Sequence, residues 1–130
     1  MRDITTQFGE NAGKIWQVLY EEGSLDKKSL MKATKLTEKD LHAGLGWLAR
    51  ENKICREGED YYRLDNTNLT PEIGKTAGKV FKVMDIWGEV DPPILKKLIG
   101  ANEEEIFSAL GWLAREDKIK ADEKLKFNLK

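Results

Sequence analysis

The sequence contains only one cysteine and one histidine in 130 residues. Cys55 therefore has no partner for an intrachain disulfide, and a zinc site built from several cysteine and histidine ligands is excluded. His42 has no second histidine and no nucleophile near it in the sequence, so neither a catalytic triad nor a general-base pair is predicted. We expect a chain without catalytic residues, without a metal site and without a cofactor.

Long hydrophobic runs are also missing. No apolar segment approaches the roughly 18 to 20 residues that span a bilayer, and the first ten residues lack the apolar core of a secretory signal. Hydrophobic residues make up 40% of the chain and charged residues 35%, which is typical of a globular protein. The sequence predicts a cytoplasmic protein that does not contact a membrane.

An excess of charge of one sign is absent as well. The chain has 22 basic and 23 acidic residues, a formal net charge of −1 and a pI near 5.9. This balance gives no overall attraction to a phosphate backbone, so any nucleic-acid binding depends on a locally basic face. The placement of the charges therefore decides between the classes of partner.

The sequence does contain an internal repeat. The segment AGKIWQVLYEEGSLDKKSLMK, from Ala12, aligns without a gap with AGKVFKVMDIWGEVDPPILKK, from Ala77. Of the 53 positions from Ala12 to Leu64, 19 are identical to the residue found 65 positions later. We therefore divide the chain into unit 1, residues 1–65, and unit 2, residues 66–130, joined by the short polar segment DNTNLTP.

Each unit shows the same succession of patterns. An amphipathic first helix ends at Gly23, a short extended piece leads to Asp26 as the N-cap of a second helix, and Thr37 caps a third. The period then changes from 3.6 to 2, with Tyr62 and Leu64 alternating with polar residues in a hairpin. The counterparts 65 residues later repeat this order. The sequence predicts a mainly α fold with small β-hairpins (α+β), a tandem winged helix-turn-helix.

The end of each third helix carries the block G-W-L-A-R-E-x-K-I, at residues 46–54 and again at 111–119. With this block, both units resemble a small prokaryotic winged-helix family of unknown function. The resemblance implies the fold and supplies no function. The tandem arrangement is also similar to paired winged helices in chromosome-segregation accessory and membrane-sorting proteins, which mostly bind other proteins.

Several unusual residues are interpreted as structural. Gly46 and Gly111 are expected to let the first and third helices of each unit approach closely. Trp47 and Trp112 occupy equivalent positions, where we expect each ring to cover the base of its own wing. His42 is expected to lie half-buried on the third helix of unit 1.

Basic residues distinguish unit 1 on the elements that touch DNA in other winged helices. There the third helix enters the major groove, while the second helix and the wing contact phosphates. Unit 2 has glutamates at residues 103–105, where they would repel the DNA backbone. The predicted nucleic-acid-binding residues are Lys27, Lys28, Lys32, Lys35, Lys39, Arg56 and Arg63.

Unit 2 is distinguished by additional apolar residues. Ile86 and Trp87 stand where unit 1 has two glutamates, and Phe107 stands where unit 1 has its histidine. Such residues mark an interface, either with unit 1, with a second chain or with another partner. Two hypotheses remain open: a DNA-associated, transcription-regulator-like protein in which unit 1 contacts double-stranded DNA and unit 2 docks or dimerises, or a protein-interaction module that binds no nucleic acid. Neither hypothesis includes a small-molecule substrate.

Overall fold

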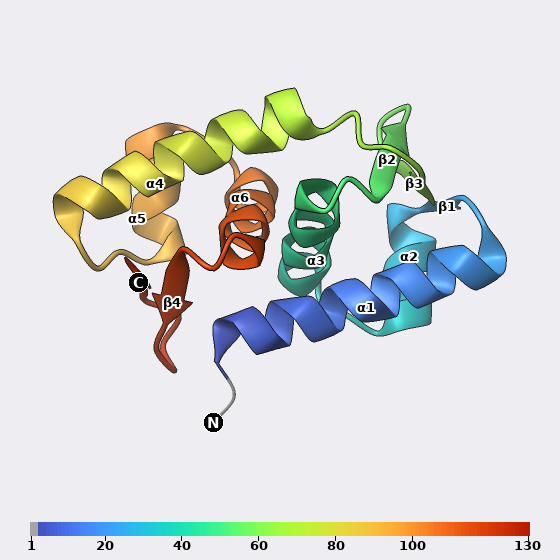
Figure 1. Ribbon diagram of the computed structural model, residues 1–130, viewed down its shortest axis with the longest axis horizontal. Helices are drawn as coiled ribbons and strands as arrows, with labels where there is room; N and C mark the ends of the chain where they lie inside the picture. The colour runs from blue at the N-terminus through green and yellow to red at the C-terminus, as the bar shows by residue number, and fades with distance from the viewer. Residues whose placement is uncertain (1–2) are drawn as a thin grey trace.

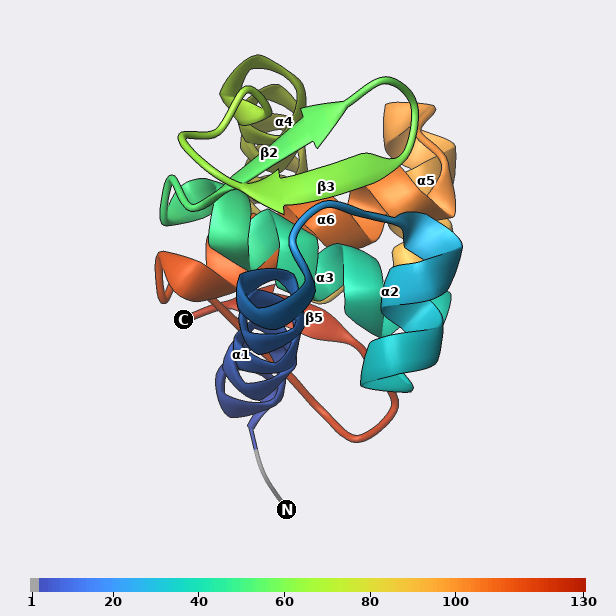
Figure 2. The same cartoon turned by 90° about the vertical axis from the view of Figure 1, so that its right-hand side faces the viewer.

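The computed structural model describes residues 3–130. Unit 1 forms the predicted order of helix, strand, helix, helix and hairpin, and its three strands pair antiparallel in the order β1-β3-β2. Figure 2 shows the hairpin β2–β3 above α3, with α2 beside it. The elements are α1 (Ile4–Glu22), β1 (Leu25–Asp26), α2 (Lys27–Thr34), α3 (Glu38–Arg50), β2 (Ile54–Glu57) and β3 (Tyr61–Leu64).

Unit 2 repeats this order with a smaller sheet. A single bridge between Val90 and Phe127 replaces the first strand. The predicted fold class, mainly helical with small antiparallel sheets, is confirmed. No helix within residues 3–130 has the length and hydropathy to cross a lipid bilayer. The elements are η1 (Thr70–Gly74), α4 (Lys75–Trp87), α5 (Pro92–Ile99), α6 (Glu103–Arg115), β4 (Ile119–Ala121) and β5 (Phe127–Leu129).

The helix boundaries follow from local chemistry. Asp26 and Asp91 each accept a hydrogen bond from the backbone N–H three residues later, at 3.0 and 2.9 Å, and so cap α2 and α5. Gly23 and Gly88 end α1 and α4 with φ angles of 81° and 77°, which a side chain would disfavour. Thr70 would be the expected N-cap before Pro71 in the polar segment DNTNLTP, but this expectation is wrong, because a π-helical turn begins at Thr70 without a side-chain cap and continues into α4.

The hydrophobic cores of the two units interlock. Ile4 and Phe8, at the start of α1, pack into the core of unit 2. Leu69 and Ile73, just before α4, pack into the core of unit 1. Figure 1 shows α1 and α4 on opposite sides of the molecule, with α3 and α6 side by side between them. The start of α1 therefore completes the core of unit 2, and the segment that leads into α4 completes the core of unit 1.

The two third helices, α3 and α6, approach each other at two glycines. A Cβ atom placed on Gly46 would lie 1.9 Å from the backbone oxygen of Ser108, and one on Gly111 would lie 1.8 Å from that of Ala43. These contacts correspond to each other under the 65-residue shift, so the two units are related by an approximate two-fold axis. The prediction that these glycines bring the first and third helices together is wrong, because they bring together the third helices of the two units.

Candidate functional site

The seam between α3 and α6 contains a pair of tryptophan–arginine contacts. Arg115 of unit 2 lies over the ring of Trp47, at 5.9 Å from guanidinium carbon to ring centroid, and Arg50 lies over Trp112 at 5.7 Å. Trp47 also packs against the backbone of Gly9 on α1. Both tryptophans therefore contact the opposite unit, which corrects the expectation that each covers only the base of its own wing.

Opposite charges of the two units meet at one side of this seam. Lys27 Nζ lies 2.6 Å from both Glu38 Oε2 and Glu104 Oε1, and Lys39 Nζ lies 3.9 Å from Glu103 Oε2. Burial alone would lower the pKa of Lys27, but the hydrogen bonds to Glu104 and Glu38 outweigh it and the pKa is raised. Glu103 and Glu104, at the start of α6, are thus partners of unit 1's lysines.

The two arginines predicted to bind phosphate also have internal partners. Arg56 Nη2 lies 2.8 Å from Glu72 Oε2, and Arg63 pairs with both Glu57 and Asp65. Four of the seven predicted nucleic-acid-binding residues therefore already pair with carboxylates. The remaining three are exposed and have no ion pair within the described residues: Lys28, Lys32 and Lys35.

The three predicted interface residues have different environments. Phe107 is buried in a core that includes Ala43 of unit 1, so it contributes to the contact between units. Ile86 and Trp87 are 80% and 62% exposed. Neither side chain is buried between the units, and both are accessible on the outer surface of unit 2.

Two further exposed apolar side chains were missed by the sequence analysis. Ile94 and Leu98 lie four residues apart on α5 and are 40% and 43% exposed. Their counterparts in unit 1 are Ser29 and Ala33. The difference between the two units was the signal that could have identified them, as it did for Ile86 and Trp87.

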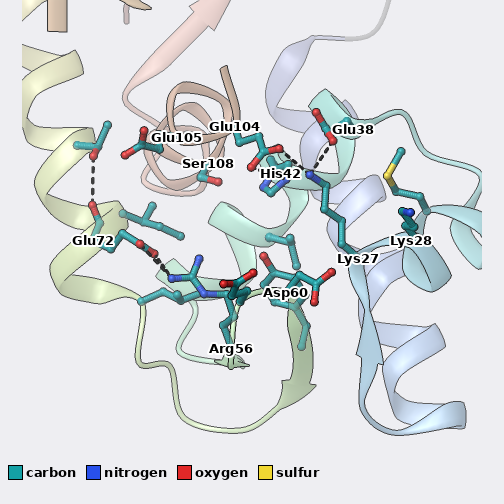
Figure 3. Close-up of a pocket in the computed structure, with 17 residues that line it drawn as sticks. Lys27, Lys28, Glu38, His42, Arg56, Asp60, Glu72, Glu104, Glu105 and Ser108 are labelled. Atoms are coloured by element: carbon teal, nitrogen blue, oxygen red, sulfur yellow. Dashed lines mark hydrogen bonds and ion pairs between the residues drawn. The ribbon is translucent and has the colours of Figure 1, made fainter. Parts of the chain in front are cut away.

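A cavity of about 640 Å³ lies between the units, next to the ion pairs of Lys27 and Arg56. Figure 3 shows Lys27, Glu38 and His42 on its unit 1 side. Unit 2 contributes residues from η1, from the start of α4 and from α6, and the unit 1 wing contributes Tyr62. The cavity collects titratable side chains from both units, and we treat it as the candidate site.

His42 lines this cavity and is almost fully buried, with only 6% of the residue exposed. Its Nε2 atom has no hydrogen-bond partner and lies 3.8 Å from Glu104 Oε2. Burial lowers the pKa of His42, and the nearby Glu104 carboxylate only partly opposes this shift. The expectation of a half-buried histidine was wrong, because α6 covers the surface of α3 on which it lies.

This burial predicts that acid destabilises the protein. The unfolded chain binds a proton at His42 near the ordinary pKa of 6.5, whereas the folded state resists protonation, so stability is lost as the pH falls below that value. The loss is at most about 1.4 kcal/mol per pH unit. Urea unfolding between pH 7 and pH 5 measures it, because carboxylates with ordinary pKa values of 3.8 and 4.5 begin to protonate only towards the lower end of this range.

The matched control is His42→Phe, because unit 2 already has Phe107 at the equivalent position. This variant should show a much flatter pH profile than the wild type over the same range. Equal slopes for the two proteins would contradict a buried, neutral imidazole at residue 42.

Comparison with known proteins adds three findings. The profile of the family described as "Winged helix-turn-helix domain (DUF2582)" matches residues 1–64 and again residues 65–127. An uncharacterised protein of Methanocaldococcus jannaschii, MJ1608, is 40% identical over 65 residues, which is 45% of this chain and 91% of that protein. The mRNA-binding domain of elongation factor SelB from E. coli, solved in complex with SECIS RNA, is similar over 93% of this chain and 98% of that domain. Its TM-score is 0.41 at 16% identity, and similarity at this level carries no information on function. The chain belongs to the DUF2582 family of winged helix-turn-helix domains, of which it contains two tandem copies.

Proposed function

We propose that this protein is a non-enzymatic protein-interaction module that binds a second copy of itself through the outer surface of unit 2. The supporting observation is the burial of both third helices against each other, at Gly46 and Gly111. In DNA-reading winged helices this helix inserts into the major groove. In this protein the corresponding side chains face the opposite unit, so base reading requires the units to separate.

The distribution of charge supports the same proposal. Most of the candidate phosphate-binding residues pair with carboxylates, which offsets their attraction for a polyanion. The alternative, DNA binding by unit 1, is favoured by Lys28 and Lys32, which lie four residues apart on one face of α2, and by Lys35 at its C-cap. Contacts to about three phosphates would give weak, non-specific binding that falls steeply with salt.

The outer surface of unit 2 supplies the proposed interface. Its exposed apolar residues replace polar or small residues at equivalent positions of unit 1, which has the same fold without them. Folding therefore does not require these side chains. Fully burying one large apolar side chain contributes about 1.5 to 3 kcal/mol. The four residues are Ile86, Trp87, Ile94 and Leu98.

A second copy of the chain is the partner that fits this surface. Exposed charges of both signs occur on the same two helices and on the loop between them: Lys82 and Lys97 are basic, and Asp85 and Glu89 are acidic. In a two-fold interface the same surface of each copy faces its counterpart, so this surface must carry both the acidic and the basic residue of any ion pair. A surface with mixed charges meets this requirement, whereas a surface of one sign would repel itself.

The double variant Ile86→Glu, Trp87→Glu tests the proposal, because it installs the residues that unit 1 has at these positions. We expect wild-type protein to sediment as a dimer at equilibrium and the double variant as a monomer with an unchanged circular dichroism spectrum. Tyr20→Asp is the matched control, since Tyr20 is also exposed and unit 2 has Asp85 in its place. A monomeric wild type at the highest soluble concentration would contradict the proposal.

Titration of a labelled mixed-sequence duplex at two salt concentrations tests the alternative. The proposal predicts no binding beyond a weak, salt-sensitive background. Tight binding that weakens with salt and is lost in Lys28→Glu, Lys32→Glu, Lys35→Glu would instead establish a DNA-binding protein.

A further inference from the structure

We propose that the cavity between the two units binds a small organic cation, consisting of one or two ammonium groups on an aliphatic body. The site is separate from the outer surface of unit 2, and the inference does not depend on the proposed function. It rests on the charge of the cavity lining, on its apolar part and on the unpartnered nitrogen of His42.

The lining has an excess of negative charge. It contains six carboxylates and three permanently charged basic side chains. Two of those basic side chains, Lys27 and Arg56, already pair with carboxylates in the lining. Within residues 3–130, Lys28 is the one lining lysine or arginine without an ion pair, and Glu105 already accepts a hydrogen bond from the backbone N–H of Asn102. Three lining carboxylates have no ion pair in the same range, so they outnumber the unpaired lysine and leave the cavity attractive to a cation: Glu59, Asp60 and Glu105.

The cavity also has apolar walls. Leu45 and Met31 contribute from unit 1, and Leu69 and Ile73 contribute from the segment that leads into α4. Leu45, Leu69 and Ile73 are themselves buried in the core of unit 1 and Met31 is half-buried, so they form an apolar wall that an aliphatic chain would contact more favourably than a hydrated inorganic ion would. The combination of apolar walls with unpaired carboxylates therefore fits an organic amine better than a metal ion.

His42 provides an independent indication of a ligand. A buried nitrogen without a hydrogen-bond partner is unfavourable, and the fold accepts a phenyl ring at the equivalent position, Phe107. The distance of 3.8 Å from His42 Nε2 to Glu104 Oε2 is too long for a direct hydrogen bond. With a modest turn of the Glu104 side chain, one ammonium group would donate to both atoms. When Nδ1 carries the proton, His42 Nε2 is an acceptor that such an ammonium group would satisfy.

Isothermal titration calorimetry of the full-length protein with three linear six-carbon probes tests this inference. The probes are 1,6-diaminohexane, the neutral 1,6-hexanediol and the dianion adipate, which share an aliphatic body and differ in charge. We expect saturable binding of the diamine with one site per chain and no detectable binding of the diol or adipate. Equal binding of all three probes, or no binding of the diamine, would overturn the proposal.

Two variants locate the site. His42→Phe fills part of the cavity and removes the acceptor, so diamine binding should weaken at least tenfold. Glu105→Gln removes one unpaired carboxylate without changing the size of the side chain, and we expect a loss of about fivefold. Glu123→Gln, on the unit 2 wing outside the cavity, is the matched control and should bind like the wild type. Diamine binding that is unchanged in both cavity variants, or equally weakened in the control, would show attachment elsewhere on the surface and contradict the proposal.

Discussion

Gly46→Ala is expected to destabilise the protein by about 3 kcal/mol, the upper end of the usual range for an added methyl group, because the group would collide with backbone and not with a flexible side chain. The new Cβ would lie 1.9 Å from the carbonyl oxygen of Ser108, so α3 and α6 must move apart to accommodate it. Gly111→Ala should have a similar effect against Ala43, and the double variant should lose the contact between the units. The free energy of unfolding in urea measures each loss.

Gly13→Ala and Gly78→Ala are the matched controls for this experiment. Both glycines lie within helices, at α1 and α4, and an added Cβ would meet no atom within 4 Å. Alanine is the better helix former, so these variants should gain roughly 0.5 to 1 kcal/mol. If Gly46→Ala were tolerated as well as Gly13→Ala, the third helices would not be in close contact.

Phe8→Ala is expected to cost about 3 to 5 kcal/mol and to loosen unit 2, although the residue belongs to unit 1. Its ring is 2% exposed and lies in the same core as Leu110 and Phe127 of unit 2. Removing the ring therefore leaves a cavity in the core of the opposite unit. Amide hydrogen exchange should show faster exchange in α6 as well as in α1.

Gln17→Ala serves as the control on the same helix, because Gln17 is exposed and its side chain donates a hydrogen bond to Glu21, one turn away on α1. Its effect on the free energy of unfolding should stay within about 0.5 kcal/mol. Exchange that accelerates only in unit 1 after Phe8→Ala would show that the cores are not shared.

The fold could be predicted because its determinants are local and occur twice. Helix caps such as Asp26 and Asp91, the glycines that end the first helices, and the change from a period of 3.6 to 2 can each be recognised from a few neighbouring residues. Each of these patterns occurs again 65 residues later, and the agreement between the two copies removes the ambiguity that a single pattern has as a predictor of structure. The division of the chain at residue 65 as an independent domain boundary stays a prediction, since both cores extend across it.

The candidate site could not be predicted in the same way, because it depends on how the units pack. Lys27 and Glu104 are 77 residues apart, and in the sequence each one by itself indicates only an effect on DNA binding. The structure shows that they are partners, so the lysine-bearing unit and the acidic unit complement each other. Likewise, the exchange of His42 for Phe107 was visible in the sequence, but only the packing of α6 on α3 shows that the histidine is buried beside a cavity.

The direct contact of α3 with α6 is the central claim, because the burial of both third helices and the cavity between the units depend on it. Nuclear Overhauser spectroscopy of the full chain tests this contact at named residues. We predict cross-peaks between the α-protons of Gly46 and Ser108 and between those of Gly111 and Ala43, whose backbones meet in the structure. Absence of both cross-peaks, together with rapid amide exchange along α3 and α6, would contradict the account.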